Sequence, residues 1–260
     1  MAIPHDVQYA LSGLLVGLLV GQTGVGGGSL MTPLLVLLFG IHPATAVGTD
    51  LLYASATKTV GSVVHGANRN VDWRLVGRLA MGSLPATAVT LFAVSRFDVT
   101  SAAASHALSL ALGAVLVVTS MGLALRQRLL LWLGRYLDGI SPRRTAQLTV
   151  LTGAILGAAV SVTSVGAGAI GVTAMIALYP RLPTRTVIGS DIAHAVPLTL
   201  LAGFGHFIMG SVDLHLIALL LSGSIPGVLV GSILVSVLPE YVTRAMLATV
   251  LAIVGVRLVL

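Results

Sequence analysis

Long runs of apolar residues recur along the whole chain and are separated by short polar stretches. About 20 residues of helix cover the hydrocarbon core of a bilayer, and most of these runs approach that length. The runs lack the strict alternation of a barrel strand, and a backbone that faces lipid must pair its own N–H and C=O groups, so we expect helices. The predicted segments are 7–22, 28–40, 46–66, 73–95, 101–125, 146–163, 168–180, 186–208, 213–236 and 242–260.

Two pairs of these segments are too short for ordinary spans, and each pair flanks a cluster of glycines. The first pair flanks Thr23-Gly24-Val25-Gly26-Gly27-Gly28, and the second flanks Thr163-Ser164-Val165-Gly166-Ala167-Gly168. A helix break at membrane depth is tolerated only where its backbone is buried in protein or lines a wet cavity. We therefore predict two helix breaks inside the membrane.

The second half of the chain repeats the first half. Residues 48–85 and 189–226 align at a shift of 141 with 11 identities in 38 positions and no gap. The two glycine clusters align at a shift of 140. We expect one integrated membrane domain with a first repeat, a connector and a second repeat, at 1–125, 126–145 and 146–260.

Composition supports a membrane protein and excludes several other classes. Apolar residues make up 56% of the 260 residues and charged residues only 8%, whereas a water-soluble domain needs about a quarter charged. The net charge of +6 comes from arginines scattered between apolar runs, so we expect no nucleic-acid partner. The chain contains no cysteine, which excludes disulfides and thiol catalysis. The first 21 residues lack the basic start and cleavage site of a signal peptide, so we expect a retained segment.

The arginines are distributed unequally between the two sides of the predicted membrane domain. Placing loops 66–73, 126–145, 180–186 and 236–242 on one side puts 11 arginines there, against Arg96 and Arg257 on the other. The positive-inside rule then makes the connector cytoplasmic and both termini external. Three full crossings per half also give the halves opposite orientations. The predicted fold is an all-α polytopic membrane protein with two inverted repeats, each a broken-helix pair plus three transmembrane helices.

Several motifs occur in order and in duplicate. They are GVGGGSLMTPLL (Gly24–Leu35), AVGTD (Ala46–Asp50), NVDWR (Asn70–Arg74) and, in the second half, VIGSD, GSVDL and IPGVLVG. Over essentially its whole length the chain resembles the TauE/SafE family of sulfite and organosulfonate exporters. This resemblance implies a multi-pass carrier of the bacterial inner membrane that transports a small sulfur-containing anion, with no cofactor.

The two glycine clusters are the first candidate for a substrate site. Glycine permits positive φ and close approach, so N–H groups at the following helix N-terminus can face an anion, where the helix dipole adds positive charge. The predicted substrate-binding residues are Thr23, Gly24, Gly26, Gly27, Gly28, Ser29, Thr163, Ser164, Gly166 and Gly168. The alternative is that the glycines form a packing surface between helices.

Lys58 is the single lysine and lies in the middle of segment 46–66. An ionised lysine at the centre of a membrane helix costs about 2.5–3.5 kcal/mol, so it should face a partner or water. We include Lys58 among the substrate-binding residues, and the alternative is a structural ion pair. Asp50 and Asp191 occupy matched positions and are candidates for proton coupling, with helix capping as the alternative.

Three histidines complete the candidates for proton coupling. His194 lies one helical turn after Asp191, and His65 and His206 are matched by the repeat. Histidine titrates near neutral pH, which suits a proton relay. His65 and His206 also fall near segment ends, where they could serve as interfacial anchors.

The resulting hypothesis is a secondary transporter, an exporter of a small anion bound near the midplane between the two breaks. One alternative is a divalent-metal transporter that uses Asp50, Asp191, His65 and His206 as ligands. In the preferred hypothesis, the substrate site contains no metal. Another is a passive anion channel. No GxSxG or HExxH motif is present, so we expect no catalytic residues and no enzyme. The expected partners are the small anion and the lipid bilayer, and the sequence is compatible with a homo-oligomer.

Overall fold

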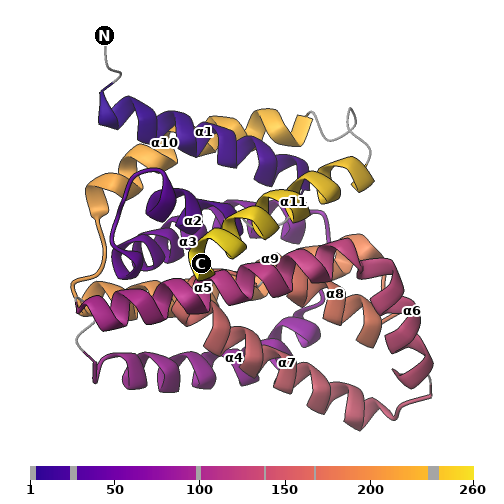
Figure 1. Ribbon diagram of the computed structural model, residues 1–260. Helices are drawn as coiled ribbons and strands as arrows, with labels where there is room; N and C mark the ends of the chain where they lie inside the picture. Colours follow the sequence, from indigo (N-terminus) through magenta and orange to yellow (C-terminus); the bar gives the residue numbers. More distant parts are fainter. Residues whose placement is uncertain (1–3, 24–27, 98–100, 138, 167, 234–239) are drawn as a thin grey trace.

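The structure is a computed structural model that describes residues 4–23, 28–97, 101–137, 139–166, 168–233 and 240–260. All regular secondary structure in the described residues is helical (Figure 1). The helices are α1 (His5–Thr23), α2 (Gly28–Leu37), α3 (Pro43–Ala67), α4 (Trp73–Val94), α5 (Ala102–Ala124), α6 (Arg126–Leu137), α7 (Pro142–Thr163), α8 (Ala169–Leu178), α9 (Thr184–Ile208), α10 (Leu214–Ile233) and α11 (Glu240–Val259).

Each predicted segment corresponds to one helix, and the predicted all-α membrane fold is confirmed. Five helices of the described chain are long and apolar enough to cross a membrane: α4, α5, α7, α9 and residues 214–231 of α10. Helix α3 has 25 residues but is absent from this group, because Asp50, Lys58 and several hydroxyl residues reduce its hydropathy. Helix α6 was not predicted and lies within the expected connector.

Helices of the first half pack mainly against helices of the second half. Helix α1 packs on α10 and α4 packs on α7, while α3 packs on α9 and α5 on α11. In Figure 1, α1 and α10 lie side by side above the remaining helices. The repeat matches α1 to α5, in order, with α7 to α11. When each helix is replaced by its match, the same helix pairs are obtained. The opposite orientation of the two halves in a membrane remains a prediction.

Glycines allow the closest of these helix contacts. A Cβ atom added to Gly17 of α1 would lie 2.9 Å from the Cα atom of Ser224 in α10. A Cβ atom added to Gly157 of α7 would lie 2.8 Å from the Cα atom of Ser83 in α4. The two contacts involve equivalent positions of the repeat. At these two positions, which lie outside the predicted glycine clusters, glycine serves close helix packing.

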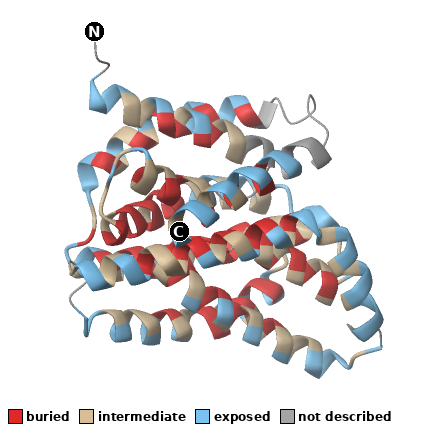
Figure 2. Ribbon diagram, viewed as in Figure 1, coloured by how far each residue is buried: buried red, intermediate tan, exposed pale blue. Residues whose placement is uncertain are grey.

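Buried and exposed positions divide the helices into an inner and an outer group (Figure 2). The buried residues of α3 lie between Pro43 and Ser55, and those of α9 extend from Val187 to His206. Outward positions of the peripheral helices carry large exposed apolar side chains such as those of Phe92, Ile155 and Ile253. Since exposed apolar surface of this extent is unfavourable in water, it fits a surface covered by lipid.

Candidate functional site

The matched carboxyl groups lie in the interior of the helix bundle. Asp50 of α3 is fully buried and Asp191 of α9 is 3% exposed. The Thr32 hydroxyl of α2 donates a hydrogen bond of 2.5 Å to Oδ2 of Asp50. Oδ1 of each aspartate has no hydrogen-bond partner among the described residues. Neither aspartate caps its helix, because α3 begins at Pro43 and α9 begins at Thr184, each seven residues earlier. The capping alternative is therefore wrong for both residues.

The second glycine cluster forms a sharp break between α7 and α8. Ser164 follows α7 as its C-cap with φ +58°, and Gly166 has φ +114°, a conformation that favours glycine. The Thr163 hydroxyl donates to the Ala159 carbonyl at 2.8 Å and accepts from the Val165 N–H at 3.2 Å, which holds the shape of the break. Helix α8 starts after Gly168 without a side-chain cap, so its first N–H groups have no side-chain acceptor.

This break faces the Asp50 carboxyl group. The Ser164 hydroxyl is buried and close enough to Asp50 to interact with its side chain. It makes no hydrogen bond of good geometry with any described residue. Asp50 therefore lies between α2, through Thr32, and the α7–α8 break, through Ser164. One carboxyl group from the first half accepts a hydrogen bond from α2 and lies beside the α7–α8 break.

The only lysine contributes a positive charge to the same region. Lys58 is half-buried on α3, and its ammonium group interacts electrostatically with both Asp191 and Asp50. No described carboxylate lies within ion-pair distance of it. The alternative of a direct structural ion pair therefore finds no partner in the described part of the chain. Two buried carboxyl groups and one half-buried ammonium group therefore interact in this region.

A pair of hydrogen bonds repeats across the two halves beside these charges. The Ser83 hydroxyl of α4 lies 2.8 Å from Nε2 of His194 in α9. At the equivalent positions, the Tyr53 hydroxyl of α3 donates to the Ser224 hydroxyl of α10 at 2.7 Å. All four residues are buried. Sequence reasoning found His194 but missed Tyr53, Ser83 and Ser224, although the matched Gly-Ser-x-Pro motifs of the repeat contain both serines.

The matched histidines lie against the glycines that precede the two aspartates. A Cβ atom on Gly48 would meet the side chain of His206 at 2.8 Å, and one on Gly189 would meet Nδ1 of His65 at 3.1 Å. His206 is 1% exposed, and its Nε2 lies 2.9 Å from the Ser161 carbonyl. His65 is half-buried. Burial of His206 rules out the predicted alternative role as an interfacial anchor for that residue.

The first glycine cluster lies largely outside the described residues. Gly24, Gly26 and Gly27 are not described, while Thr23 ends α1 and Gly28 and Ser29 begin α2. Leu30, the next residue of α2, packs against the apolar cluster that contains Val165 and Ala169. This cluster also contains residues of α5 and α11, and α2 contacts α11 directly. The role of the first cluster itself stays a prediction.

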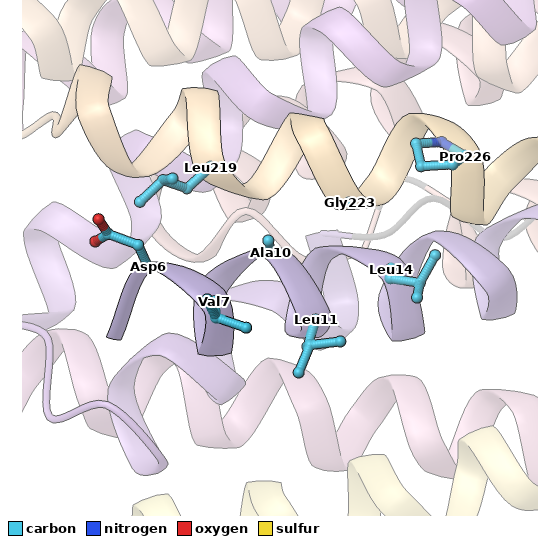
Figure 3. Close-up of a pocket in the computed structure, with 8 residues that line it drawn as sticks. All are labelled: Asp6, Val7, Ala10, Leu11, Leu14, Leu219, Gly223 and Pro226. Atoms are coloured by element: carbon cyan, nitrogen blue, oxygen red, sulfur yellow. The ribbon is translucent and has the colours of Figure 1, made fainter. Parts of the chain in front are cut away.

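The described residues also bear on the alternative of a divalent-metal transporter. In the described ranges no three His, Asp or Glu side chains lie close enough together to hold a metal ion, and Asp50, Asp191, His65 and His206 form no such group there. The groove in Figure 3 lies between α1 and α10 and is lined mainly by apolar residues such as Leu11 and Leu14. It contains none of the predicted site residues.

Apolar helices that enclose a buried polar cluster define a multi-pass membrane protein. The family described as Sulfite exporter TauE/SafE matches residues 9–258, and the chain belongs to this family of membrane transporters. A protein of Bacillus subtilis (strain 168) named "Probable membrane transporter protein YjnA" is 38% identical over 259 residues, covering 98% of this chain and 100% of its own. "Probable membrane transporter protein YdhB" of the same organism is 27% identical over 248 residues, covering 94% and 96% of the two chains. No solved structure gives a significant match.

Proposed function

We propose that the protein is a secondary transporter that exports a small sulfur-containing anion such as sulfite or an organosulfonate. The anion binds near the middle of the membrane, between the two glycine-rich breaks. The observation that supports this site most directly is the position of Asp50, which contacts α2 through Thr32 and lies beside Ser164 of the α7–α8 break. A single residue thus connects both interrupted helix pairs, the elements that bind substrate in many secondary transporters.

The charges of the cluster suggest how an anion is accepted. Lys58 supplies positive charge, and the uncapped N-terminus of α8 supplies N–H groups and a favourable helix dipole. Two carboxylates oppose anion binding unless they are protonated or held away from the anion. We therefore assign Asp50 and Asp191 to proton coupling, with His194 one turn after Asp191 as the neighbouring proton carrier. His65 and His206 are retained as further candidates for proton coupling because each contacts the glycine before one aspartate.

The orientation of the protein also belongs to this proposal. From the charge distribution we infer a cytoplasmic connector and external termini, in the inner membrane of a bacterium. Because the chain contains no cysteine, a single cysteine at Gln127 or at Ala102 provides a clean label for an impermeant maleimide. In intact cells we expect labelling at Ala102, at the outer end of α5, and not at Gln127. The opposite pattern contradicts the proposed orientation.

Transport in proteoliposomes tests the proposed function. Vesicles loaded with unlabelled sulfite, sulfoacetate or taurine should accumulate the corresponding radiolabelled solute by counterflow, whereas a channel gives no accumulation. Lys58→Gln should reduce counterflow at least tenfold. Arg96→Gln changes a residue predicted to lie on the external side of the membrane domain and should leave counterflow unchanged. Asp50→Asn and Asp191→Asn should abolish transport driven by a pH gradient while retaining counterflow. Wild-type flux in Lys58→Gln, or no sulfur anion transported by the wild type, contradicts the proposal.

A further inference from the structure

Helix α6 lies on the outside of the bundle and has no buried residue. It contacts α8 and α5. Its half-buried side includes Leu129, Leu130, Leu133 and Leu137, which recur at helical spacing. The opposite side is exposed and carries basic residues. A helix of this type is attached to the bundle along one side and leaves its other side free for contact with the membrane surface.

Two aromatic side chains flank the exposed basic side of α6. The rings of Trp132 and Tyr136 lie 4.8 Å apart, and the residues are 56% and 68% exposed. Trp and Tyr are enriched at the level of lipid headgroups, where an apolar ring and a polar group are both accommodated. Arg128 and Arg135 are exposed on the same helix. Basic and aromatic residues together are typical of a helix that lies in the membrane interface.

A cleft of about 600 Å³ opens where α5, α6 and α11 meet. Its lining combines the polar residues Gln127, Arg128 and Thr249 with apolar residues that include Leu123, Ala245 and Ala248. The Ser120 hydroxyl of α5 donates to the Ala248 carbonyl of α11 at 2.9 Å, which fixes the wall of the cleft. No carboxylate in the described part of the chain forms an ion pair with Arg128.

We propose that this cleft binds an anionic glycerophospholipid of the cytoplasmic leaflet. The Arg128 guanidinium binds the phosphodiester group, for which its planar pair of N–H donors is well suited, and an acyl chain lies along Ala245 and Ala248. Trp132 and Tyr136 place α6 at headgroup depth beside the bound lipid. Charge complementarity identifies the occupant, because the same side of the protein carries most of the arginines and anionic lipids concentrate in that leaflet.

Native mass spectrometry of the purified protein tests the site directly. The protein in mild detergent is mixed with equal amounts of dioleoyl phosphatidylglycerol and dioleoyl phosphatidylcholine, and the retained lipids are counted. The wild type should retain one phosphatidylglycerol in preference to phosphatidylcholine. Arg128→Gln should reduce the retained fraction at least fivefold, and Arg128→Lys should restore part of it. Arg96→Gln is the matched control and should behave as the wild type. The Arg96 guanidinium lies over the Phe92 ring at the C-terminal end of α4 and is not part of the cleft.

Two further arms distinguish a lipid from a free anion. Ala245→Phe adds bulk at a residue that lines the cleft without changing its charge, and should also reduce lipid retention at least fivefold. Inorganic phosphate alone should not raise the melting temperature, whereas phosphatidylglycerol should. Equal retention of phosphatidylglycerol by the wild type and Arg128→Gln overturns the proposal, and so does equal stabilisation by inorganic phosphate. None of these measurements requires transport activity, so the lipid site can fail while the proposed transport function holds.

Discussion

Replacing Ser83 by alanine removes the hydrogen bond to the ring of His194. Both residues are fully buried, and Nδ1 of His194 has no partner among the described residues. The variant therefore leaves a buried imidazole without the Ser83 hydroxyl that lies 2.8 Å from its Nε2. An unsatisfied buried polar group costs about 1–3 kcal/mol, and hydrogen bonds between membrane helices average about 0.6 kcal/mol. We expect the free energy of unfolding to fall by about 1–2 kcal/mol.

The repeat supplies a matched variant for this prediction. Ser224→Ala leaves the buried Tyr53 hydroxyl without its acceptor, so we expect a similar loss from a different residue pair. The change Ser83→Ala combined with His194→Leu removes both polar partners and should be less destabilising than Ser83→Ala alone. The two serines belong to separate pairs, so their effects should add.

Reversible unfolding in mixed detergent micelles, followed by tryptophan fluorescence, measures these differences. The assay requires comparable expression and a monodisperse elution profile for each variant. If Ser83→Ala unfolds at the same denaturant concentration as the wild type, the Ser83–His194 hydrogen bond does not contribute as reasoned. If the double variant is less stable than Ser83→Ala, the buried imidazole is satisfied by another group.

Three further predictions follow from the geometry of single residues. Gly157→Ala places a Cβ atom 2.8 Å from a Cα atom of α4, so overpacking should lower the melting temperature, while Gly122→Ala, with nothing within 4 Å, should raise it slightly. Gly171→Ala places a Cβ atom 2.6 Å from Oδ1 of Asp191. This contact displaces the Asp191 side chain and not a backbone, so transport driven by a pH gradient should fall severalfold, with little change in counterflow or in melting temperature. Asp72→Ala removes the side-chain cap of α4 and should cost about 1 kcal/mol in unfolding free energy, measured in the same micelles.

The apolar runs predicted the helices well because the hydrocarbon core requires a minimum length of apolar helix. The segment predicted at 73–95 is the helix Trp73–Val94, for example. Helix starts were less predictable where capping residues extend a helix into polar sequence. Helix α7 begins at Pro142, capped by the Ser141 hydroxyl, four residues before the predicted segment at 146. Arg143 and Arg144 belong to this first turn, although their charge suggested a connector.

Helix α6 was missed because its arginines concealed its apolar face. The leucines at 129, 130, 133 and 137 have the spacing of an amphipathic helix, and this signal was present in the sequence. A connector with no apolar run of spanning length can still contain this shorter period. Interfacial helices are generally detected by this periodicity and not by mean hydropathy.

The charged residues of the candidate site were predictable, but their hydroxyl partners were not. Asp50, Asp191 and Lys58 stand out because charge is rare and expensive in apolar segments. Serine and threonine are common in membrane helices and often donate to a carbonyl of their own helix, as Thr199 does to Ala195 at 2.8 Å. Sequence alone therefore does not distinguish such a residue from Thr32, which reaches across to Asp50.

The two halves match in framework but differ in charge, and this difference bears on the number of binding sites. The aspartates are duplicated, whereas the position equivalent to Lys58 is Thr199 and the position equivalent to Tyr53 is His194. The lysine interacts electrostatically with the aspartates of both halves. A duplicated framework with two independent anion sites would need a cation in each half, and the second half has none at the matched position. We therefore expect a single anion site, shared between the halves, with a stoichiometry of one anion per chain in equilibrium binding. Two equivalent sites would contradict this reasoning.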